Sequence, residues 1–157
     1  MTPRRNRRAI DWLQAIVVGL LATHIMTLTG FWQAGLGLNQ MDVGAMLAAN
    51  MDHGYVWGQL AHYLNGIVLA VIYARWVMGL LPGGPFARGL AYGLLTTVAA
   101  GIIVAPLAAN AGIFFTAVPN PGLMVLSSLT AHLAYGLAVA LAYRPEERFL
   151  TIATERE

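Results

Sequence analysis

The chain has 157 residues, of which 58% are hydrophobic and only 10% are charged, and its mean hydropathy is +0.64. Soluble domains carry about 25% charged residues. A soluble fold of this length could not bury so much apolar surface, because small domains leave a large fraction of their surface exposed. The net charge is only +2, but residues 89–143 contain no Asp, Glu, Lys or Arg. The absence of Cys excludes disulfides and thiolate chemistry.

Four apolar segments follow one another along the chain, at about residues 10–35, 56–78, 89–109 and 122–143. Each reaches the roughly 20 residues that a helix needs to cross a bilayer. Helices are expected because every backbone polar group must be satisfied inside the membrane, and the ten-residue alternation of membrane β-strands is absent. The first segment is too long for the apolar region of a signal peptide, so we expect it to be retained. The sequence therefore predicts an all-α membrane protein with one four-helix domain over residues 1–157.

The basic residues predict the orientation of these helices. All nine are Arg, and they lie in the N-terminal tail, the second connection with its flanks, and the C-terminal tail: Arg4, Arg5, Arg7, Arg8, Arg75, Arg88, Arg144, Arg148 and Arg156. The first and third connections contain none. The positive-inside rule then places both termini in the cytoplasm and the chain, as a multi-pass protein, in the bacterial inner membrane. The N-terminal Arg cluster is explained by the positive-inside rule and by attraction to anionic lipid headgroups. Membrane lipids are therefore expected partners, and nucleic acid is not.

The first connection, at about residues 36–54, is predicted to carry a short external helix. Asp42 can cap a helix that runs through Ala49, and Asn50 is expected to stop it. This piece is apolar because it contains three methionines, Met41, Met46 and Met51. It should therefore lie on the membrane surface or tuck into the mouth of the bundle.

The two halves of the chain, at about 10–78 and 89–143, resemble each other. The matching residues are Ala61, His62, Gly66, Ala70 and Tyr73 in the first half and Ala131, His132, Gly136, Ala140 and Tyr143 in the second. A further match, at an offset of 74 rather than 70, aligns residues 19–23 with 93–97 and makes the first loop about four residues longer. We interpret the halves as two helical hairpins that form a parallel repeat about an axis along the membrane normal. Small residues, including Gly66 and Gly136, should line the helix contacts.

Histidines inside the predicted helices are the candidate functional residues, because polar groups in a bilayer are costly and often functional. His62 and His132 lie at similar depth and could ligate a b-type haem, with Gly66 and Gly136 leaving room for the porphyrin. His24 could instead pair with His62. The alternative is that each His forms a hydrogen bond to a Thr, Ser, Asn or carbonyl across the bundle.

A weaker metal site is predicted in the external loop. Met51, Asp52 and His53, together with Asp42, could bind a cation, and the soft Met sulfurs favour Cu(I). The alternative is a surface helix whose Met side chains face lipid and whose Asp residues cap helix ends. No embedded Asp or Glu accompanies the serines near His132, which argues against a hydrolytic site.

Short motifs along nearly the whole chain resemble an uncharacterised family of small bacterial four-helix membrane proteins that carry a domain of unknown function. They are Gly19-Leu20-Leu21-Ala22-Thr23-x-x-Met26-Thr27, Met41-Asp42-x-x-Ala45-Met46-Leu47, Trp57-x-x-x-x-His62-x-x-x-Gly66 and the stretch from Gly122 through His132-x-x-Tyr135-Gly136. The resemblance implies fold and membrane location but no activity.

The expected function is therefore non-enzymatic. We expect a small integral membrane subunit or accessory protein that acts through helix packing and through contacts with lipid or a partner, as part of a larger membrane complex. The alternative from a different class is an electron-transfer protein with haem b held by His62 and His132.

Overall fold

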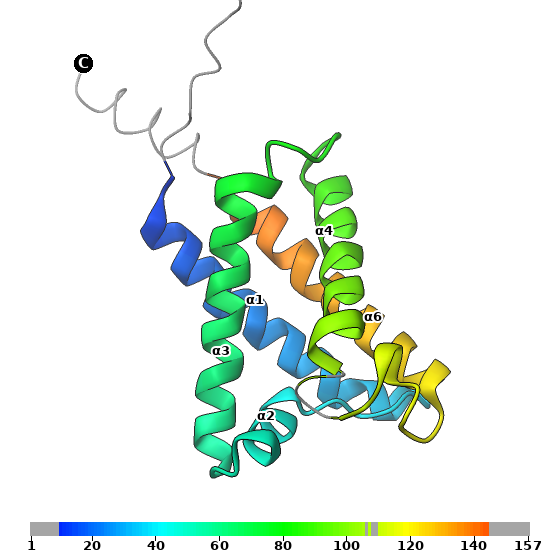
Figure 1. Ribbon diagram of the computed structural model, residues 1–157. Helices are drawn as coiled ribbons and strands as arrows, with labels where there is room; N and C mark the ends of the chain where they lie inside the picture. Colours follow the sequence, from blue (N-terminus) through cyan, green and yellow to red (C-terminus); the bar gives the residue numbers. More distant parts are fainter. Residues whose placement is uncertain (1–9, 106, 108–109, 145–157) are drawn as a thin grey trace, which may run out of the picture.

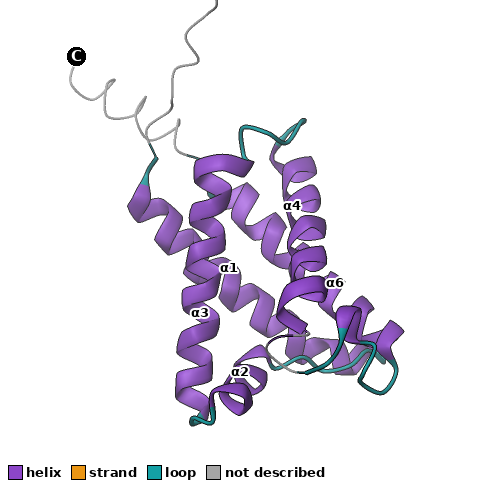
Figure 2. Cartoon of the chain, in the orientation of Figure 1, coloured by secondary structure: helices purple, strands orange, loops and turns teal. Residues whose placement is uncertain are grey.

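The computed structural model describes residues 10–105, 107 and 110–144. Four helical spans in this part are long and apolar enough to cross a membrane: Trp12–Leu36, Tyr55–Val77, Pro85–Val104 and Pro121–Ala142. The described residues form helices, turns and loops without a β-strand (Figure 2). The protein is therefore an all-α four-helix membrane protein, which confirms the predicted fold class.

The helices are divided as follows: α1 (Trp12–Trp32) with a 3-10 turn (Gln33–Leu36), α2 (Val43–Met51), α3 (Tyr55–Ile72) with a π turn (Tyr73–Val77), α4 (Pro85–Ala99) with a π turn (Ala100–Val104), a 3-10 turn (Ile113–Phe115), and α6 (Pro121–Ala142). Three spans match the predicted bounds to within two residues. The third begins at Pro85 rather than at Gly89, because proline is pre-organised for the first turn of a helix. Its predicted end at residue 109 lies outside the described residues.

The helices pack as two hairpins (Figure 1). In the first, α1 lies against α3 and α2 packs on α3; in the second, α4 lies against α6. The contact between α1 and α6 joins the hairpins. The turn at residues 78–84 lies at the same end of the bundle as the start of α1 and the end of α6, whereas α2 and the connection at 110–120 lie at the other end.

Glycines allow the helices of each hairpin to approach closely. A Cβ atom on Gly19 would lie 2.7 Å from Ile67 Cα, and one on Gly89 would lie 2.8 Å from Leu137 Cα. Both distances are shorter than real Cβ contacts, so only glycine fits there. Close approach through small residues is a main source of helix association in lipid.

These contacts can be compared with the predicted alignment of the first helix. Gly19 and Gly89 face equivalent partners, 70 positions apart, so Gly89 rather than Gly93 takes the place that corresponds to Gly19. The packing of these two glycines favours an offset of 70 for the first helix over the predicted offset of 74. Four residues are about one helical turn, so a shift of that size leaves the same face inward and an apolar match cannot distinguish the two registers.

The capping of α2 follows the prediction at its start but not at its end. Asp42 accepts a hydrogen bond from the Ala45 backbone N–H at 2.9 Å. The helix continues through the predicted stop at Asn50, whose side chain donates to the Met46 carbonyl at 2.8 Å. It ends at Asp52, which adopts the left-handed conformation with φ 51°.

The position of α2 decides between the two predicted alternatives. A Cβ atom on Gly58 of α3 would overlap the Gly44 carbonyl oxygen and would lie 2.6 Å from the Ala48 backbone nitrogen. The contact is therefore backbone against backbone. The short helix is tucked against α3 at the mouth of the bundle, which it narrows.

Large apolar side chains cover the outside of the bundle. Leu20, Leu64, Leu94 and Leu126 are all exposed in the isolated chain. The four Trp residues are also exposed and lie near the ends of the first two spans: Trp12, Trp32, Trp57 and Trp76. These positions are typical of an aromatic belt at a membrane interface.

Candidate functional site

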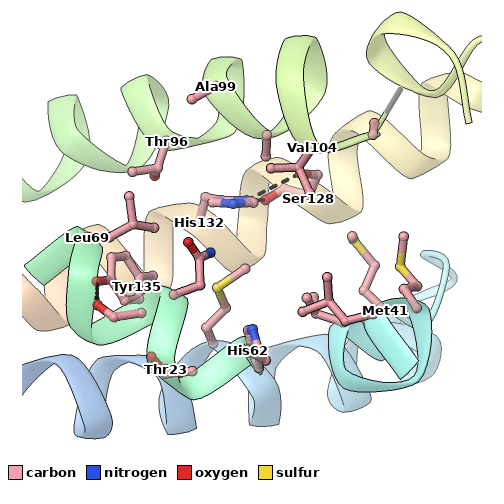
Figure 3. A pocket seen from close by; sticks show the side chains of 18 of the residues that line it. Thr23, Met41, His62, Leu69, Thr96, Ala99, Val104, Ser128, His132 and Tyr135 are labelled. Atoms are coloured by element: carbon pink, nitrogen blue, oxygen red, sulfur yellow. Dashed lines mark hydrogen bonds between the residues drawn. The ribbon is translucent and has the colours of Figure 1, made fainter. Parts of the chain in front are cut away.

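A cavity of about 170 Å³ lies between the four spans, and residues of α2 and of the segment just before it line one side of it (Figure 3). His62, Asn65 and Gly66 of α3 line it, as do Ser128, His132 and Tyr135 of α6. The cavity has room for a small molecule, since a cavity of about 150 Å³ can hold benzene. It is smaller than the roughly 300–1,000 Å³ of most ligand pockets.

The wall of the cavity is mainly apolar and rich in sulfur. Met26 of α1 lines it, as do Met41, which precedes α2, and Met46 within α2. Met26 and Met41 are buried. Among the described residues that line the cavity there is no Asp, Glu, Lys or Arg. Any ligand would therefore meet imidazoles, thioethers, hydroxyls and an amide but no charged lining side chain, although the nearby Asp42 carboxylate interacts electrostatically with His62.

The hydrogen bonds of His132 define its tautomer. Its Nδ1 lies 2.7 Å from the Ser128 carbonyl oxygen and 3.2 Å from Ser128 Oγ. A carbonyl can only accept, so Nδ1 carries the proton and donates it. In the neutral ring the other nitrogen, Nε2, is then unprotonated and carries a lone pair that can accept a hydrogen bond.

The tautomer of His62 follows from a second chain of hydrogen bonds. Its Nε2 lies 3.2 Å from Thr27 Oγ1, and the Thr27 hydroxyl itself donates to the Thr23 carbonyl oxygen at 2.9 Å. Because the hydroxyl proton is already used, Thr27 accepts from His62 Nε2–H. The lone pair of His62 is therefore on Nδ1.

Both histidines thus contribute an unprotonated nitrogen to a site with apolar walls. Within the described chain, neither His62 Nδ1 nor His132 Nε2 has a hydrogen-bond partner. The two side chains come from different helices and line the same cavity (Figure 3). Such nitrogens can accept a hydrogen bond or coordinate a metal ion.

Two tyrosines fix the helix that carries His62. The Tyr135 hydroxyl donates to the Gly66 carbonyl oxygen at 2.6 Å, and the Tyr92 hydroxyl donates to the Leu69 carbonyl oxygen at 2.7 Å. The rings of Tyr92 and Tyr135 lie 6.4 Å apart between their centroids. Tyr92 comes from α4 and Tyr135 from α6. The second hairpin therefore holds α3 at the cavity wall, which Tyr135 itself helps to form.

The wall formed by α4 includes a π turn. In this turn the Ala105 backbone N–H donates to the Ala100 carbonyl oxygen, five residues back, and both residues line the cavity. The aromatic ring of Phe114 fills the space beside Gly101. Single π turns inside α-helices often occur at functional sites.

The structure separates His24 from the other predicted site residues. His24 is exposed on α1, and its Nδ1 lies 2.9 Å from the Tyr63 hydroxyl. It does not line the cavity. The predicted pairing of His24 with His62 is therefore not formed, because His24 lies on the exposed surface with Tyr63, whereas His62 is buried and lines the cavity.

The predicted loop metal site is not assembled either. Met51, Asp52 and His53 are all exposed, and His53 Nδ1 hydrogen-bonds the Asp52 carbonyl oxygen at 2.8 Å. The described residues contain no group of three or more His, Cys, Asp or Glu placed to hold a metal ion. Asp52 instead caps the end of α2, as the alternative interpretation expected for an Asp in this loop.

The packing leaves no space for a porphyrin. Gly66 was expected to make room for one, but a Cβ atom there would overlap Thr23 Oγ1, and one on Gly136 would overlap the Gly89 carbonyl oxygen. Both glycines are used for helix contacts, and Gly136 does not line the cavity. With only about 170 Å³ available, the residues present do not fit haem.

Sequence reasoning overlooked Gln33 as a structural polar residue. It follows α1 and is buried, and its Nε2 donates to the Ser127 carbonyl oxygen at 2.7 Å and to Thr130 Oγ1 at 2.5 Å. These bonds tie the end of α1 to α6. An amide at the end of an apolar segment was the available signal.

Comparisons with protein-family models, curated proteins and solved structures gave no match.

Proposed function

We propose that the protein is a small ligand-holding membrane protein, an accessory subunit without a reaction of its own, whose ligand occupies the central cavity. The observation that carries this proposal is the pair of lone-pair nitrogens, His62 Nδ1 and His132 Nε2, at one apolar cavity. A nitrogen left without a partner inside a bilayer is costly. A ligand that engages both nitrogens would remove that cost.

The lining chemistry favours holding over catalysis. The cavity offers two imidazoles, an amide, hydroxyls and thioethers, but among the described residues no carboxylate orients either imidazole. Acid–base and nucleophilic mechanisms usually need such an orienting group. We therefore retain the non-enzymatic hypothesis and assign it to this cavity.

The Arg residues support a location in the bacterial cytoplasmic membrane with both termini inside. Arg75 lies in the turn that closes α3, Arg144 follows α6, and Arg88 Nε donates to the Leu81 carbonyl oxygen at 3.1 Å. All three belong to the end of the bundle opposite α2. The other six Arg residues lie outside the described residues. By the positive-inside rule the cavity then lies in the outer half of the membrane, below α2.

We also propose that the two hairpins are a duplicated unit and that the exposed apolar surface contacts lipid and a larger membrane complex. The equivalent surroundings of Gly19 and Gly89 support duplication. The resemblance to an uncharacterised bacterial family of four-helix membrane proteins is consistent with this proposal.

Binding of phenol tests the ligand-holding function. Phenol is close to benzene in size, and its hydroxyl can donate to an imidazole nitrogen. Saturation-transfer NMR on the full chain in lipid nanodiscs should detect phenol binding that is lost in Ala100→Phe, which fills the cavity from the α4 wall. A matched change on the lipid-facing side, Val98→Phe, should leave binding intact, because Val98 is exposed. Equal binding by all three proteins would overturn the proposal.

A further inference from the structure

The cavity combines two unprotonated histidine nitrogens with methionine sulfurs, and together these atoms select a narrow class of ligand. Each histidine uses its only N–H locally, on the Ser128 carbonyl or the Thr27 hydroxyl, and presents a lone pair on its other nitrogen. Metal-ligating histidines almost always have this arrangement, in which the N–H donates to a carbonyl, carboxylate or similar acceptor. The arrangement fixes both ring orientation and tautomer before any metal binds.

Three thioethers share the cavity with these nitrogens. Met26 comes from α1, and Met41 and Met46 come from the segment that closes the mouth. Thioether sulfur is a soft ligand that selects Cu(I), and imidazole also suits copper. The hard cations Mg²⁺ and Ca²⁺ require oxygen ligands, mainly carboxylates, and the described lining has no carboxylate.

Charge near the cavity is sparse, with no charged side chain among the described lining residues and only the Asp42 carboxylate acting on His62 from beside them, and this limits the charge of the ligand. An uncompensated ion in an apolar interior is penalised, and the penalty rises steeply with charge. A monovalent ion that is coordinated directly by neutral nitrogen and sulfur atoms has the smallest penalty. A divalent ion such as Zn²⁺ is usually bound by charged thiolate or carboxylate ligands, or by three histidines, none of which the described lining provides.

We propose that the cavity is a Cu(I) site in which His62 Nδ1 and His132 Nε2 coordinate the ion together with thioether sulfur from Met26, Met41 or Met46. The inference rests on the proposed ligand-holding function and names its ligand class. The site differs from the loop site predicted at Met51, Asp52 and His53, because it lies inside the bundle.

The position of the methionines indicates how the ion would enter. Met41 and Met46 belong to the segment at the outer mouth, and Met26 on α1 lines the same cavity as the histidines. The Met41 backbone N–H donates to the Gly30 carbonyl oxygen at 3.2 Å, which anchors this segment to α1. A soft ion arriving from outside would therefore meet thioethers first and imidazoles next.

The test is a Cu(I) titration of the full chain in nanodiscs without oxygen, in competition with the chelator bicinchoninate. Ag(I), which has the same charge and softness and is stable in air, serves as a second probe. We expect one equivalent to bind. Joint replacement, His62→Gln with His132→Gln, should lower the affinity by more than the roughly 10–100-fold that is typical of outer-shell changes.

The thioethers are tested by Met26→Leu, Met41→Leu and Met46→Leu in one protein, because Met and Leu exchange with little cost to packing. We expect about a tenfold or larger loss of Cu(I) affinity, and X-ray absorption at the copper edge should show both nitrogen and sulfur neighbours in the wild type. The matched controls are Met51→Leu, His53→Gln and His24→Gln, all at exposed positions outside the cavity. These should bind as the wild type does.

The outcomes separate this inference from the proposed function. Phenol binding without Cu(I) binding would overturn the copper site and leave the ligand-holding cavity in place. Cu(I) binding that falls equally in the control variants would also overturn it, since the ion would then be on the surface. Failure of both phenol and Cu(I) to bind would overturn both proposals. If the double Gln variant does not fold, the methionine variant still decides.

Discussion

His62 Nε2 on α3 lies 3.2 Å from Thr27 Oγ1 on α1, and because the Thr27 hydroxyl donates to the Thr23 carbonyl oxygen, this contact leaves His62 Nδ1 for a ligand. We predict that Thr27→Val, which keeps the shape but removes the acceptor, lowers Cu(I) affinity about 10–100-fold. The fold should lose only about 0.6 kcal/mol, and at most about 1.7, as is typical of hydrogen bonds between membrane helices. Chelator competition and thermal unfolding measure the two effects.

Thr29→Val is the matched control for this prediction. The Thr29 hydroxyl donates to the Ile25 carbonyl within α1 and contacts neither histidine. It should therefore leave the Cu(I) affinity unchanged. An equal loss of affinity in both variants would show that the Thr27 effect comes from α1 in general.

The contact of Gly66 with Thr23 gives a prediction for helix packing. A Cβ atom on Gly66 would overlap Thr23 Oγ1 and would lie 3.0 Å from Thr23 Cβ. Gly66→Ala should therefore destabilise the protein by about 1–3 kcal/mol, as overpacking usually does. Adding Thr23→Ala, which removes the overlapping oxygen, should recover part of this loss in thermal unfolding in detergent.

Gly136→Ala is the informative counterpart, because its Cβ would meet backbone. The overlapping atom is the Gly89 carbonyl oxygen, and Gly93 Cα would lie 2.8 Å away. No side-chain replacement on α4 can relieve that overlap, so we expect the destabilisation to persist. The packing described for both hairpins would be contradicted if a second side-chain substitution restored the stability of Gly136→Ala while Thr23→Ala failed to restore that of Gly66→Ala.

The sequence predicted the fold well because long apolar runs have one main solution in a bilayer. The four spans, the Asp42 cap and the short helix that follows it all agree with local rules. The register of the first helix did not, because an apolar segment shifted by one turn looks the same, whereas the contacts of Gly19 and Gly89 distinguish the two registers. Register depends on which backbone atoms meet, and that is a property of two helices rather than of one.

The site was only half predictable for a similar reason. His62 and His132 stand out in any apolar sequence, and Thr and Ser were expected as their partners. Met26 did not stand out, because a methionine in an apolar helix has no local signal, and Met46 was assigned to the loop. Their common cavity forms only when α2 folds back against α3.

The docking of α2 depends on Gly58, which allows backbone contact with Gly44 and Ala48. A Cβ atom on Gly58 would lie 2.6 Å from the Ala48 backbone nitrogen. We predict that Gly58→Ala loosens α2, so that hydrogen exchange of its amides becomes faster while exchange in α6 is unchanged. Gly54→Ala, where a Cβ meets open space, should have no such effect. Unchanged exchange in both variants would mean that α2 does not depend on this contact.

The orientation of the bundle can be measured directly because the chain contains no Cys. Gly54 and Gly79 lie at opposite ends of the second span, and a Cβ atom at either position would have no neighbouring heavy atom within 4 Å. With both termini in the cytoplasm, Gly54→Cys should react with a membrane-impermeant maleimide in intact bacterial cells. Gly79→Cys should react only after the cells are permeabilised, because its turn lies at the end with the Arg residues. The opposite pattern would invert the bundle and place the cavity in the cytoplasmic half, where a ligand arriving from outside could not reach it through the mouth at α2.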